Sequence, residues 1–367
     1  MIAAEGTLME VLSAFDFGAA VEETARYGEG HINDTFCVRA RSGRRFILQR
    51  MSAAAFKHPD QLMENVIGVT DYLGREIEKR GGDRSREALE VLRPKNGQPY
   101  YTDSRGGAWR LYPFIENTIC YQSAQTAELF AASGRAFGRF QLLLRDYPAA
   151  TLHETIPRFH DTEDRLDKLK AAVQADKLGR RGKCREEIDF MLARKNDCSV
   201  ALDAMREGRI PLRVTHNDTK LNNVLMDRDT GEGLCVIDLD TVMPGLAIND
   251  FGDSIRFGAN HCAEDETDLS KVELDLELFA VYTAAFLEGA GGSLTDEEIA
   301  LLPWGAKLMT LECGIRFLTD YLVGDEYFRI SREDHNLDRT RTQCKLVADM
   351  ERHWDRLTEI VDRYKKG

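Results

Sequence analysis

Hydrophobic and polar residues alternate over short stretches in the first third of the chain, which is typical of β-strands. The predicted strands are 35–40, 45–51, 88–93, 99–102 and 109–115. The residues RSGR join the first two strands and predict a hairpin, and Asn96-Gly97 predicts a second one. We therefore expect a small antiparallel sheet in this part of the chain.

The period of the pattern changes to that of a helix over 58–80, and Gly81-Gly82 ends this run. Further along, helical patterns dominate 123–145, 161–208 and 250–366, with a strand-rich island over 211–242. The fold class is thus α+β. We place a boundary near Glu116, between a β-rich lobe (1–115) with one helix and a mainly helical lobe (116–367).

The length of the chain agrees with two lobes, and its composition disfavours several classes of binding partner. With 367 residues, the chain exceeds the usual size of a single hydrophobic core. Its net charge of -13 disfavours general binding to nucleic acid or anionic membranes, and no apolar run is long enough for a membrane span. The eight cysteines contain no CxxC pair, so we expect a reduced cytoplasmic protein. The acidic helical lobe is compatible with either a monomer or a dimer.

The segment with the clearest chemical pattern is RVTHNDTKLNNVLMD, followed by LCVIDLDTVMPG, inside the strand-rich island. The pattern predicts a loop after 212–215, a strand over 224–226, a polar turn and a return strand over 234–237. Asn223 begins the first strand of this hairpin and Asp238 ends the second. In an antiparallel pair, these two positions lie side by side.

This arrangement suits phosphoryl transfer, in which the protein mainly positions Mg²⁺, a phosphate and one hydroxyl. Asn223 and Asp238 offer the oxygen ligands that Mg²⁺ prefers. Asp218 is the candidate catalytic base, Lys220 the candidate cation for the transferred phosphoryl group, and His216 braces the loop. The alternative is a buried polar turn between two core strands, where polar side chains without partners would be costly.

The same residues resemble a known family. HNDTKLNN with VIDLD is similar to the catalytic loop and metal-binding hairpin of the aminoglycoside phosphotransferase and choline kinase superfamily. GEGHINDTF, VIDLDTVMPGLAINDFGDSIR and CGIRFLTDYLVGDEYF add a narrower resemblance to the N-acetylhexosamine 1-kinases. The similarity extends from about Tyr27 to Ala348.

The resemblance implies the two-lobed fold of protein kinases, with Mg²⁺ as cofactor and ATP and a small-molecule sugar as substrates. The implied reaction transfers the γ-phosphate of ATP to the anomeric hydroxyl of GlcNAc or GalNAc. Two alternatives remain open. One is a kinase of the same superfamily that acts on an aminoglycoside, choline, homoserine or another sugar, and the other is a nucleotide-binding pseudokinase.

Asp250-Phe251-Gly252 spells the metal-binding DFG of protein kinases but follows a Pro-Gly turn and opens an apparent helix. We expect Asp250 to cap this helix and Asp253 to be structural. Asp238 remains the expected metal ligand because it ends the strand after the catalytic loop. Asp240 is intermediate, either a second metal ligand or a substrate contact.

Nucleotide contacts are expected in the β-rich lobe. Gly28 and Gly30 precede the first hairpin, where a kinase places its Gly-rich loop over the phosphates. The following strand has Gln49 where a lysine is expected, beside Arg50, and strand alternation allows only one of the two to face ATP. We favour Arg50, with Glu64 as its partner. The remaining nucleotide candidates, near the expected hinge, are Tyr112, Phe114 and Ile115.

Acceptor contacts are expected in two places. His31, Asn33 and Asp34 follow the glycine pair, and their alternative role is a local turn. Arg316 interrupts an apolar helical run and Tyr327 follows the Gly324-Asp325 break. The resemblance to the N-acetylhexosamine 1-kinases implies that this arginine and tyrosine hold the sugar; an arginine buried against a helix carboxylate is the structural alternative.

Overall fold

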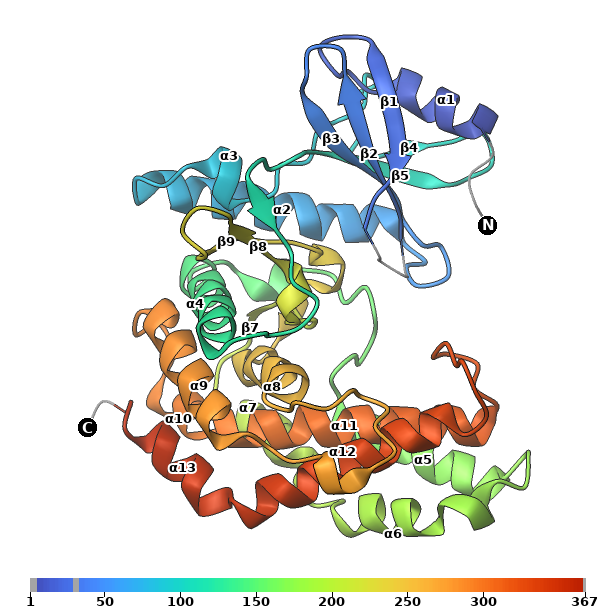
Figure 1. Ribbon diagram of the computed structural model, residues 1–367, viewed down its shortest axis with the longest axis vertical. Coiled ribbons are helices and arrows are strands. Elements are labelled where there is room, and N and C mark those ends of the chain that lie inside the picture. The colour runs from blue at the N-terminus through green and yellow to red at the C-terminus, as the bar shows by residue number, and fades with distance from the viewer. Residues whose placement is uncertain (1–4, 29–32, 366–367) are drawn as a thin grey trace.

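A computed structural model describes residues 5–28 and 33–365, and shows an N-terminal lobe built on a sheet above a larger helical lobe (Figure 1). The sheet is antiparallel, with the strand order β1-β2-β3-β5-β4. Its strands are β1 (Val21–Arg26), β2 (Asp34–Ala40), β3 (Arg45–Arg50), β4 (Tyr101–Thr102) and β5 (Ala108–Pro113). The kinase-like fold class is confirmed.

The two predicted hairpins have different outcomes. β2 and β3 pair directly, as RSGR predicted. The hairpin around Asn96-Gly97 is wrong, although a turn forms there, because both flanks pair with β5 instead of with each other. Leu92 forms a bridge with Leu111, and Tyr101 in β4 pairs with Trp109. Helix α3 (Arg84–Glu87) occupies the start of this region.

The two faces of the sheet have different chemistry. One face packs Phe46, Leu48, Trp109 and Leu111 against helix α1 (Glu5–Ala14) in a hydrophobic core. Strand alternation places Gln49 of β3 and its register partner Arg110 of β5 on the other face. This second face contacts the helical lobe, because Arg110 pairs there with Asp240.

Helix α2 (Pro59–Lys79) forms where its period predicted, and it packs on the helical lobe. Its buried residues, such as Val66 and Val69, share a core with Phe140 and Val242. Asn65 reinforces this contact, since its Nδ2 donates to the backbone oxygens of His153 at 2.8 Å and Val242 at 3.0 Å. By its packing, α2 is therefore attached to the lobe that begins near residue 116.

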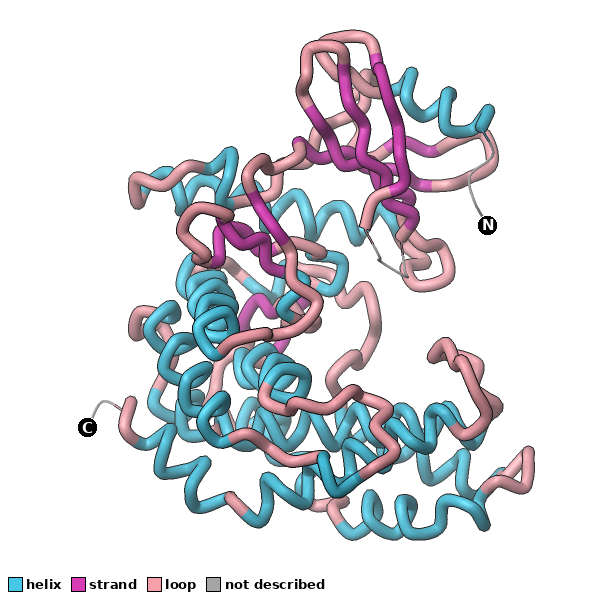
Figure 2. The backbone as a smooth tube through the Cα atoms, viewed as in Figure 1, coloured by secondary structure: helices cyan, strands magenta, loops and turns pink. Residues whose placement is uncertain are grey.

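The second lobe is largely helical, as Figure 2 shows by colour. Its α-helices are α4 (Ala127–Leu143), α5 (Thr162–Ala175), α6 (Arg185–Ala193), α7 (Val200–Arg206), α8 (Ala247–Gly258), α9 (Leu276–Ala290), α10 (Asp296–Ala300), α11 (Leu302–Val323), α12 (His335–Arg352) and α13 (Trp354–Asp362). The 3-10 turns are η1 (Ala149–Thr151), η2 (Arg181–Cys184), η3 (Asp197–Ser199), η4 (Leu221–Asn223), η5 (Leu239–Thr241) and η6 (Leu269–Lys271). Among the described helices, none has the length and apolar character needed to cross a bilayer.

Short strands between these helices position the central polar residues. They are β6 (Thr118–Ile119), β7 (Arg213–Thr215), β8 (Val224–Asp227), β9 (Gly233–Val236) and β10 (Met243–Gly245). β8 and β9 form the predicted hairpin, with Val224 opposite Val236. The N–H of Ile237 donates to the oxygen of Asn223 at 2.9 Å, so Asn223 and Asp238 lie at the same end of this hairpin.

Candidate active site

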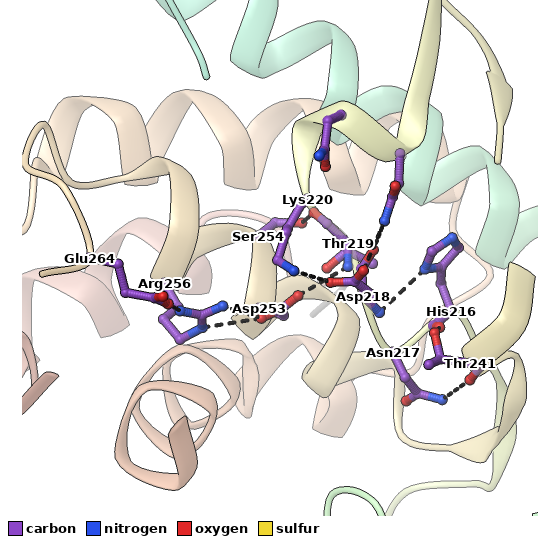
Figure 3. Close-up of polar contacts among 12 residues, drawn as sticks. His216, Asn217, Asp218, Thr219, Lys220, Thr241, Asp253, Ser254, Arg256 and Glu264 are labelled. Atoms are coloured by element: carbon purple, nitrogen blue, oxygen red, sulfur yellow. Dashed lines mark hydrogen bonds and ion pairs between the residues drawn. The ribbon is translucent and has the colours of Figure 1, made fainter. Parts of the chain in front are cut away.

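Helix α8 fixes the backbone of the loop between β7 and η4, and Figure 3 shows part of this arrangement. Asp250 accepts hydrogen bonds from the N–H groups of His216 and Asn217, at 2.9 and 2.8 Å. Asp253 accepts one from the N–H of Thr219 at 3.0 Å. Asn217 has a φ of 65°, in the left-handed region that few non-glycine residues adopt. Two carboxylates of one helix thus set the loop conformation.

Asp250 has a structural role, as expected, but the prediction that it caps a helix is wrong. Helix α8 begins at Ala247, so Asp250 lies within the first turn, and the N-cap residue Leu246 makes no side-chain hydrogen bond. The Asp250 carboxylate also accepts from Gln141 Nε2 at 2.9 Å. Burial raises the pKa of Asp250, because it disfavours the charged carboxylate. Hydrogen bonds from protein N–H groups offset part of this rise.

His216 braces the loop, as its position in the motif suggested. Its Nε2 lies 2.8 Å from the oxygen of Ile237, and its Nδ1 accepts from the N–H of Asp218 at 3.3 Å. The ring is fully buried and lies edge-to-face against Phe137 and Phe140. His216 therefore connects the catalytic loop to the end of β9.

Asp218, Lys220 and Asn223 form a compact group at the tip of the loop (Figure 3). Lys220 Nζ lies 2.8 Å from Asp218 Oδ1, and Asn223 Nδ2 donates to Asp218 Oδ2 at 3.1 Å. Burial alone would lower the pKa of Lys220, but the Asp218 and Asp253 carboxylates outweigh it and raise the pKa. The Asp218 side chain keeps 30% of its surface exposed, so its oriented carboxylate remains accessible.

Asp238 follows β9 in a left-handed conformation, with φ 59°. Asp238 is exposed as a residue, although its carboxyl group is desolvated by the protein atoms around it. This desolvation, and then the nearby Asp240 and Asp218 carboxylates, raise the pKa of Asp238 to about 7. Such a concentration of negative charge, next to the Asn223 amide, fits a divalent cation with several water ligands.

Because the carboxyl of Asp238 binds its proton more tightly in the folded state, ionising it costs stability. The cost is absent below the unfolded pKa of about 4, grows as the pH rises, and is complete above the folded pKa of about 7. Solvent screens part of this cost, because Asp238 is exposed. Without Mg²⁺, Asp238→Asn should therefore melt about 1–2 °C above the wild type at pH 8 and close to it at pH 5. Thermal unfolding at both pH values tests this, and a variant that is less stable at pH 8 would contradict it.

Asp240 is occupied by protein groups. It forms a buried ion pair with Arg110 of β5, and its Oδ2 accepts from Asn33 Nδ2 at 2.7 Å. Arg110 also donates to Gln49 Oε1, from Nε at 3.0 Å and from Nη2 at 2.9 Å. The two roles considered for Asp240 are not supported, because this carboxylate joins the sheet to the helical lobe.

The preference for Arg50 over Gln49 is contradicted by the strand geometry. Arg50 lies on the face of β3 that carries the α1 core, near Gly107 and the Asp103 carboxylate. Gln49 lies on the face toward Asp240, where it contacts Arg110. The residue on the side of β3 toward Asp240 is thus the uncharged one, and the buried cation beside it, Arg110, comes from β5.

Glu64 does not pair with a cation of the sheet. Its Oε2 lies 2.6 Å from His153 Nε2, in an exposed contact with the helical lobe. The prediction failed because α2 packs on α4 and η5 and turns this helix face away from β3.

The glycine-rich segment is described only in part. Gly28 has φ 75°, which favours glycine, whereas Gly30 and His31 lie outside the described residues. Asn33 uses both ends of its amide within the protein, since its Oδ1 accepts from the N–H of Ser52 at 3.0 Å. Asp34 pairs with Arg26 at 2.7 Å. The acceptor contacts of Asn33 and Asp34 stay a prediction.

The end of β5 and the residues after it lead from the sheet toward β6 of the second lobe. Tyr112 is buried next to Arg110, whose guanidinium lies 5.4 Å from the ring centre. The N–H of Phe114 donates to the oxygen of Arg45 at 3.0 Å, and the oxygen of Ile115 accepts from Thr118 Oγ1 at 2.8 Å. Adenine contacts of this segment stay a prediction.

Arg316 and Tyr327 come together, as the sequence suggested. Arg316 Nη2 lies 3.5 Å from Tyr327 Oη, and its guanidinium lies 5.4–5.6 Å from the ring centres of Phe159, Tyr327 and Phe328. Arg165 lies close to Arg316. Burial lowers the pKa of Arg165, and the nearby positive charge of Arg316 lowers it further. In the described part of the chain, neither arginine forms an ion pair with a carboxylate.

A buried polar contact connects this pair to the catalytic loop. His160, next to Phe159, has Nδ1 2.9 Å from Glu312 Oε1 and Nε2 3.4 Å from the oxygen of Asn217. Glu312 lies one helical turn before Arg316 on α11, and the charges of His160, Arg316 and Arg165 outweigh its burial and lower its pKa. The two arginines thus lie close enough to influence Glu312, and His160 joins this carboxylate to the backbone of Asn217.

Comparison with known proteins identifies the family. The profile described as "Phosphotransferase enzyme family" matches residues 23–282, which extend from within β1 past β10 and include the whole β8–β9 hairpin. The chain belongs to the phosphotransferase enzyme family. This phosphotransferase is therefore an ATP-dependent small-molecule kinase of the kind that the family comprises.

Solved structures agree with this kinase fold. The amicoumacin kinase hAmiN matches with a TM-score of 0.60 and 15% identity, over 98% of this chain and 94% of that one. A microcompartment-associated aminopropanol kinase gives 0.60 and 16%, over 97% and 99%. A choline/ethanolamine kinase family protein from Mesorhizobium loti gives 0.53 and 19%, over 93% of each chain. At these identities, the likeness concerns the fold of the phosphotransferase alone.

Two contributions to the site were missed in the sequence. Arg110 was placed in a strand but not considered for chemistry, although a charged residue inside WRLYPFI needs a buried partner. His160 gave no signal, because it lies in an irregular stretch and its partners are distant in sequence.

Proposed function

We propose that this kinase phosphorylates the anomeric hydroxyl of an N-acetylhexosamine, GlcNAc or GalNAc, and forms the sugar 1-phosphate. The observation that carries the proposal is the pair Arg316 and Tyr327, which His160 and Phe159 connect to the catalytic loop. It is the arrangement that the resemblance of the C-terminal segment to the N-acetylhexosamine 1-kinases implies.

In the proposed reaction, Asp218 orients the sugar hydroxyl and accepts its proton. The hydroxyl oxygen forms a bond to the γ-phosphorus, the bond between that phosphorus and the β–γ bridging oxygen breaks, and ADP leaves. Lys220, held 2.8 Å from Asp218, neutralises charge on the transferred group. The C1–O bond of the sugar is not broken, so its anomeric configuration is retained.

Mg²⁺ would be held by Asn223 and Asp238 and, when bound, neutralises charge on the phosphates. The chemistry of this donor set supports the assignment: desolvation and then the nearby Asp240 and Asp218 carboxylates raise the pKa of Asp238, and a cation would relieve the repulsion between these carboxylates. Related proteins of the same fold have been solved with AMP-PNP and Ca²⁺, and with ADP. In our proposal, Gly28 and Gly30 cover the phosphates and residues 112–115 face adenine.

The charges on the acceptor side support a neutral sugar over a cationic acceptor. Choline or an aminoglycoside would call for carboxylates or an aromatic cage. Here, the guanidinium of Arg316 lies 3.5 Å from the Tyr327 hydroxyl, and Arg165 is close enough to both to feel their charges. Like charges at this separation would repel a cationic acceptor, whereas N–H donors and a tyrosine hydroxyl suit sugar hydroxyl and carbonyl oxygens.

A panel assay with ATP and Mg²⁺ tests the proposal, using GlcNAc, GalNAc, choline, homoserine and kanamycin as acceptors. We expect phosphorylation of at least one hexosamine, with kcat/KM at least about 100-fold above that for the cationic acceptors. Phosphorylation of choline alone, with both hexosamines inert, would overturn the sugar assignment and leave the family assignment intact.

A further inference from the structure

The turn after α11 is held by one buried carboxylate, that of Asp320. Its Oδ1 accepts from the N–H groups of Glu326 at 3.0 Å and Tyr327 at 2.8 Å. Its Oδ2 accepts from the N–H of Phe328 at 2.9 Å and from Asn336 Nδ2 at 3.0 Å. Only 4% of Asp320 is exposed, so four protein donors replace the water that this carboxylate would otherwise bind.

The backbone before these amides is equally constrained. Helix α11 ends at Val323; its C-cap residue Gly324 has φ 124°, and Asp325 has φ 59°. The N–H groups of both residues donate to the backbone oxygen of Asp320, at 3.0 and 2.8 Å. Asn336 of α12 also donates to Asp325 Oδ1 at 2.9 Å, and Arg180 pairs with the same carboxylate. The turn is therefore fixed from α11, from α12 and from the segment before η2.

What this network holds in place is an exposed aromatic residue. Tyr327 is 70% exposed, whereas its neighbour Phe328 packs on the buried Phe317, with ring centres 4.6 Å apart. In Figure 1, the connection between α11 and α12 projects from the helical layer toward the N-terminal lobe. Asp320 is buried and fully hydrogen-bonded, yet the residue that it fixes is an exposed ring. This arrangement favours a role in ligand binding over a role in core stability.

We infer that Asp320 is a positioning residue for the acceptor: it holds the 324–328 turn so that Tyr327 and Arg316 form a preorganised wall for a neutral, hydroxyl-rich substrate. This inference rests on the proposed function and extends it to a residue that does not touch the substrate. A turn that is ordered before binding saves the entropy of ordering Tyr327 in the complex. The carboxylate thus acts on acceptor affinity, and the nucleotide side is unaffected.

The main test is Asp320→Asn. Asparagine keeps one acceptor oxygen, but its NH₂ group faces N–H donors, so at least one pair of the four hydrogen bonds is lost. We expect the KM for the sugar to rise at least about tenfold, with kcat and the KM for ATP within about twofold of the wild type. Hydrogen exchange at the amides of 326–328 should accelerate in the same variant.

Asp349→Asn is the matched control. Asp349 is also a buried aspartate, and it accepts from the N–H of Leu274 at 2.7 Å, in a different part of the lobe. This variant should lower Tm without changing the KM for the sugar. If Asp320→Asn does not fold, Asn336→Ala removes one of the four donors and should still raise this KM about threefold.

The outcomes separate this inference from the proposed function. If Tyr327→Ala raises the KM for the sugar and Asp320→Asn, or Asn336→Ala in its place, leaves it unchanged, then the inference about Asp320 is wrong and the proposed function stands. If Tyr327→Ala also leaves the KM unchanged, then the acceptor site itself is wrongly placed. If Asp349→Asn lowers Tm and sugar affinity as much as Asp320→Asn does, then Asp320 contributes to stability alone.

Discussion

Asp218→Asn is expected to lower kcat by about 10²- to 10⁴-fold, with little change in Tm or in nucleotide affinity. Asparagine keeps the size of the side chain but cannot accept the hydroxyl proton. The structure supports a localised effect, because Asp250 and Asp253 hold the loop backbone and Asp218 does not. Single-turnover rates and titration with a fluorescent ADP analogue would measure the two quantities.

Asp229→Asn provides the control for this experiment. Asp229 lies in the nearby β8–β9 turn, where its exposed carboxylate accepts from Asn117 Nδ2 at 2.7 Å. This variant should keep kcat within about twofold of the wild type. If Asp218→Asn loses nucleotide binding along with activity, then Asp218 has a structural role; if it keeps full activity, then it is not the base.

The second large effect separates two aspartates that sequence alone could confuse. Asp238→Asn should lower Mg²⁺-dependent turnover by about 10³-fold, because an ion of this kind supplies several kcal/mol of charge stabilisation. Asp250→Asn should instead lower the free energy of unfolding by about 1–3 kcal/mol, since one amide nitrogen would then face the N–H groups of His216, Asn217 or Gln141.

Thermal unfolding and the dependence of kcat on Mg²⁺ concentration distinguish these variants. Residual activity in Asp250→Asn should keep the wild-type Mg²⁺ requirement, whereas Asp238→Asn should fold well and show a weakened response to Mg²⁺. The assignment of the metal site would be wrong if Asp250→Asn lost its Mg²⁺ dependence while Asp238→Asn remained active.

The local parts of this fold could be predicted from the sequence. The helices α2 and α4 and the β8–β9 hairpin depend on neighbouring residues, and all of them are present. The motif from His216 to Asn223 also lies within one loop, so the contacts of Asp218 with Lys220 and Asn223 agree with the expected spacing.

Predictions that depended on distant partners were less successful. Whether Gln49 or Arg50 faces the helical lobe depends on the register of β3 with β5, and the nearest cation, Arg110, comes from β5. Similarly, the flanks of Asn96-Gly97 pair with β5 because it offers a longer partner than either flank offers the other. Strand alternation limited the alternatives at these positions, but only tertiary pairing could decide between them.

The measurement that tests the account most directly is a crystal structure with Mg²⁺, a nonhydrolysable ATP analogue and GlcNAc. The account predicts that oxygens of Asn223 and Asp238 lie about 2.1 Å from Mg²⁺, and that an Asp218 oxygen lies about 2.6–3.2 Å from the anomeric hydroxyl. A metal ion bound by Asp250, or a sugar bound out of reach of Asp218, would contradict it.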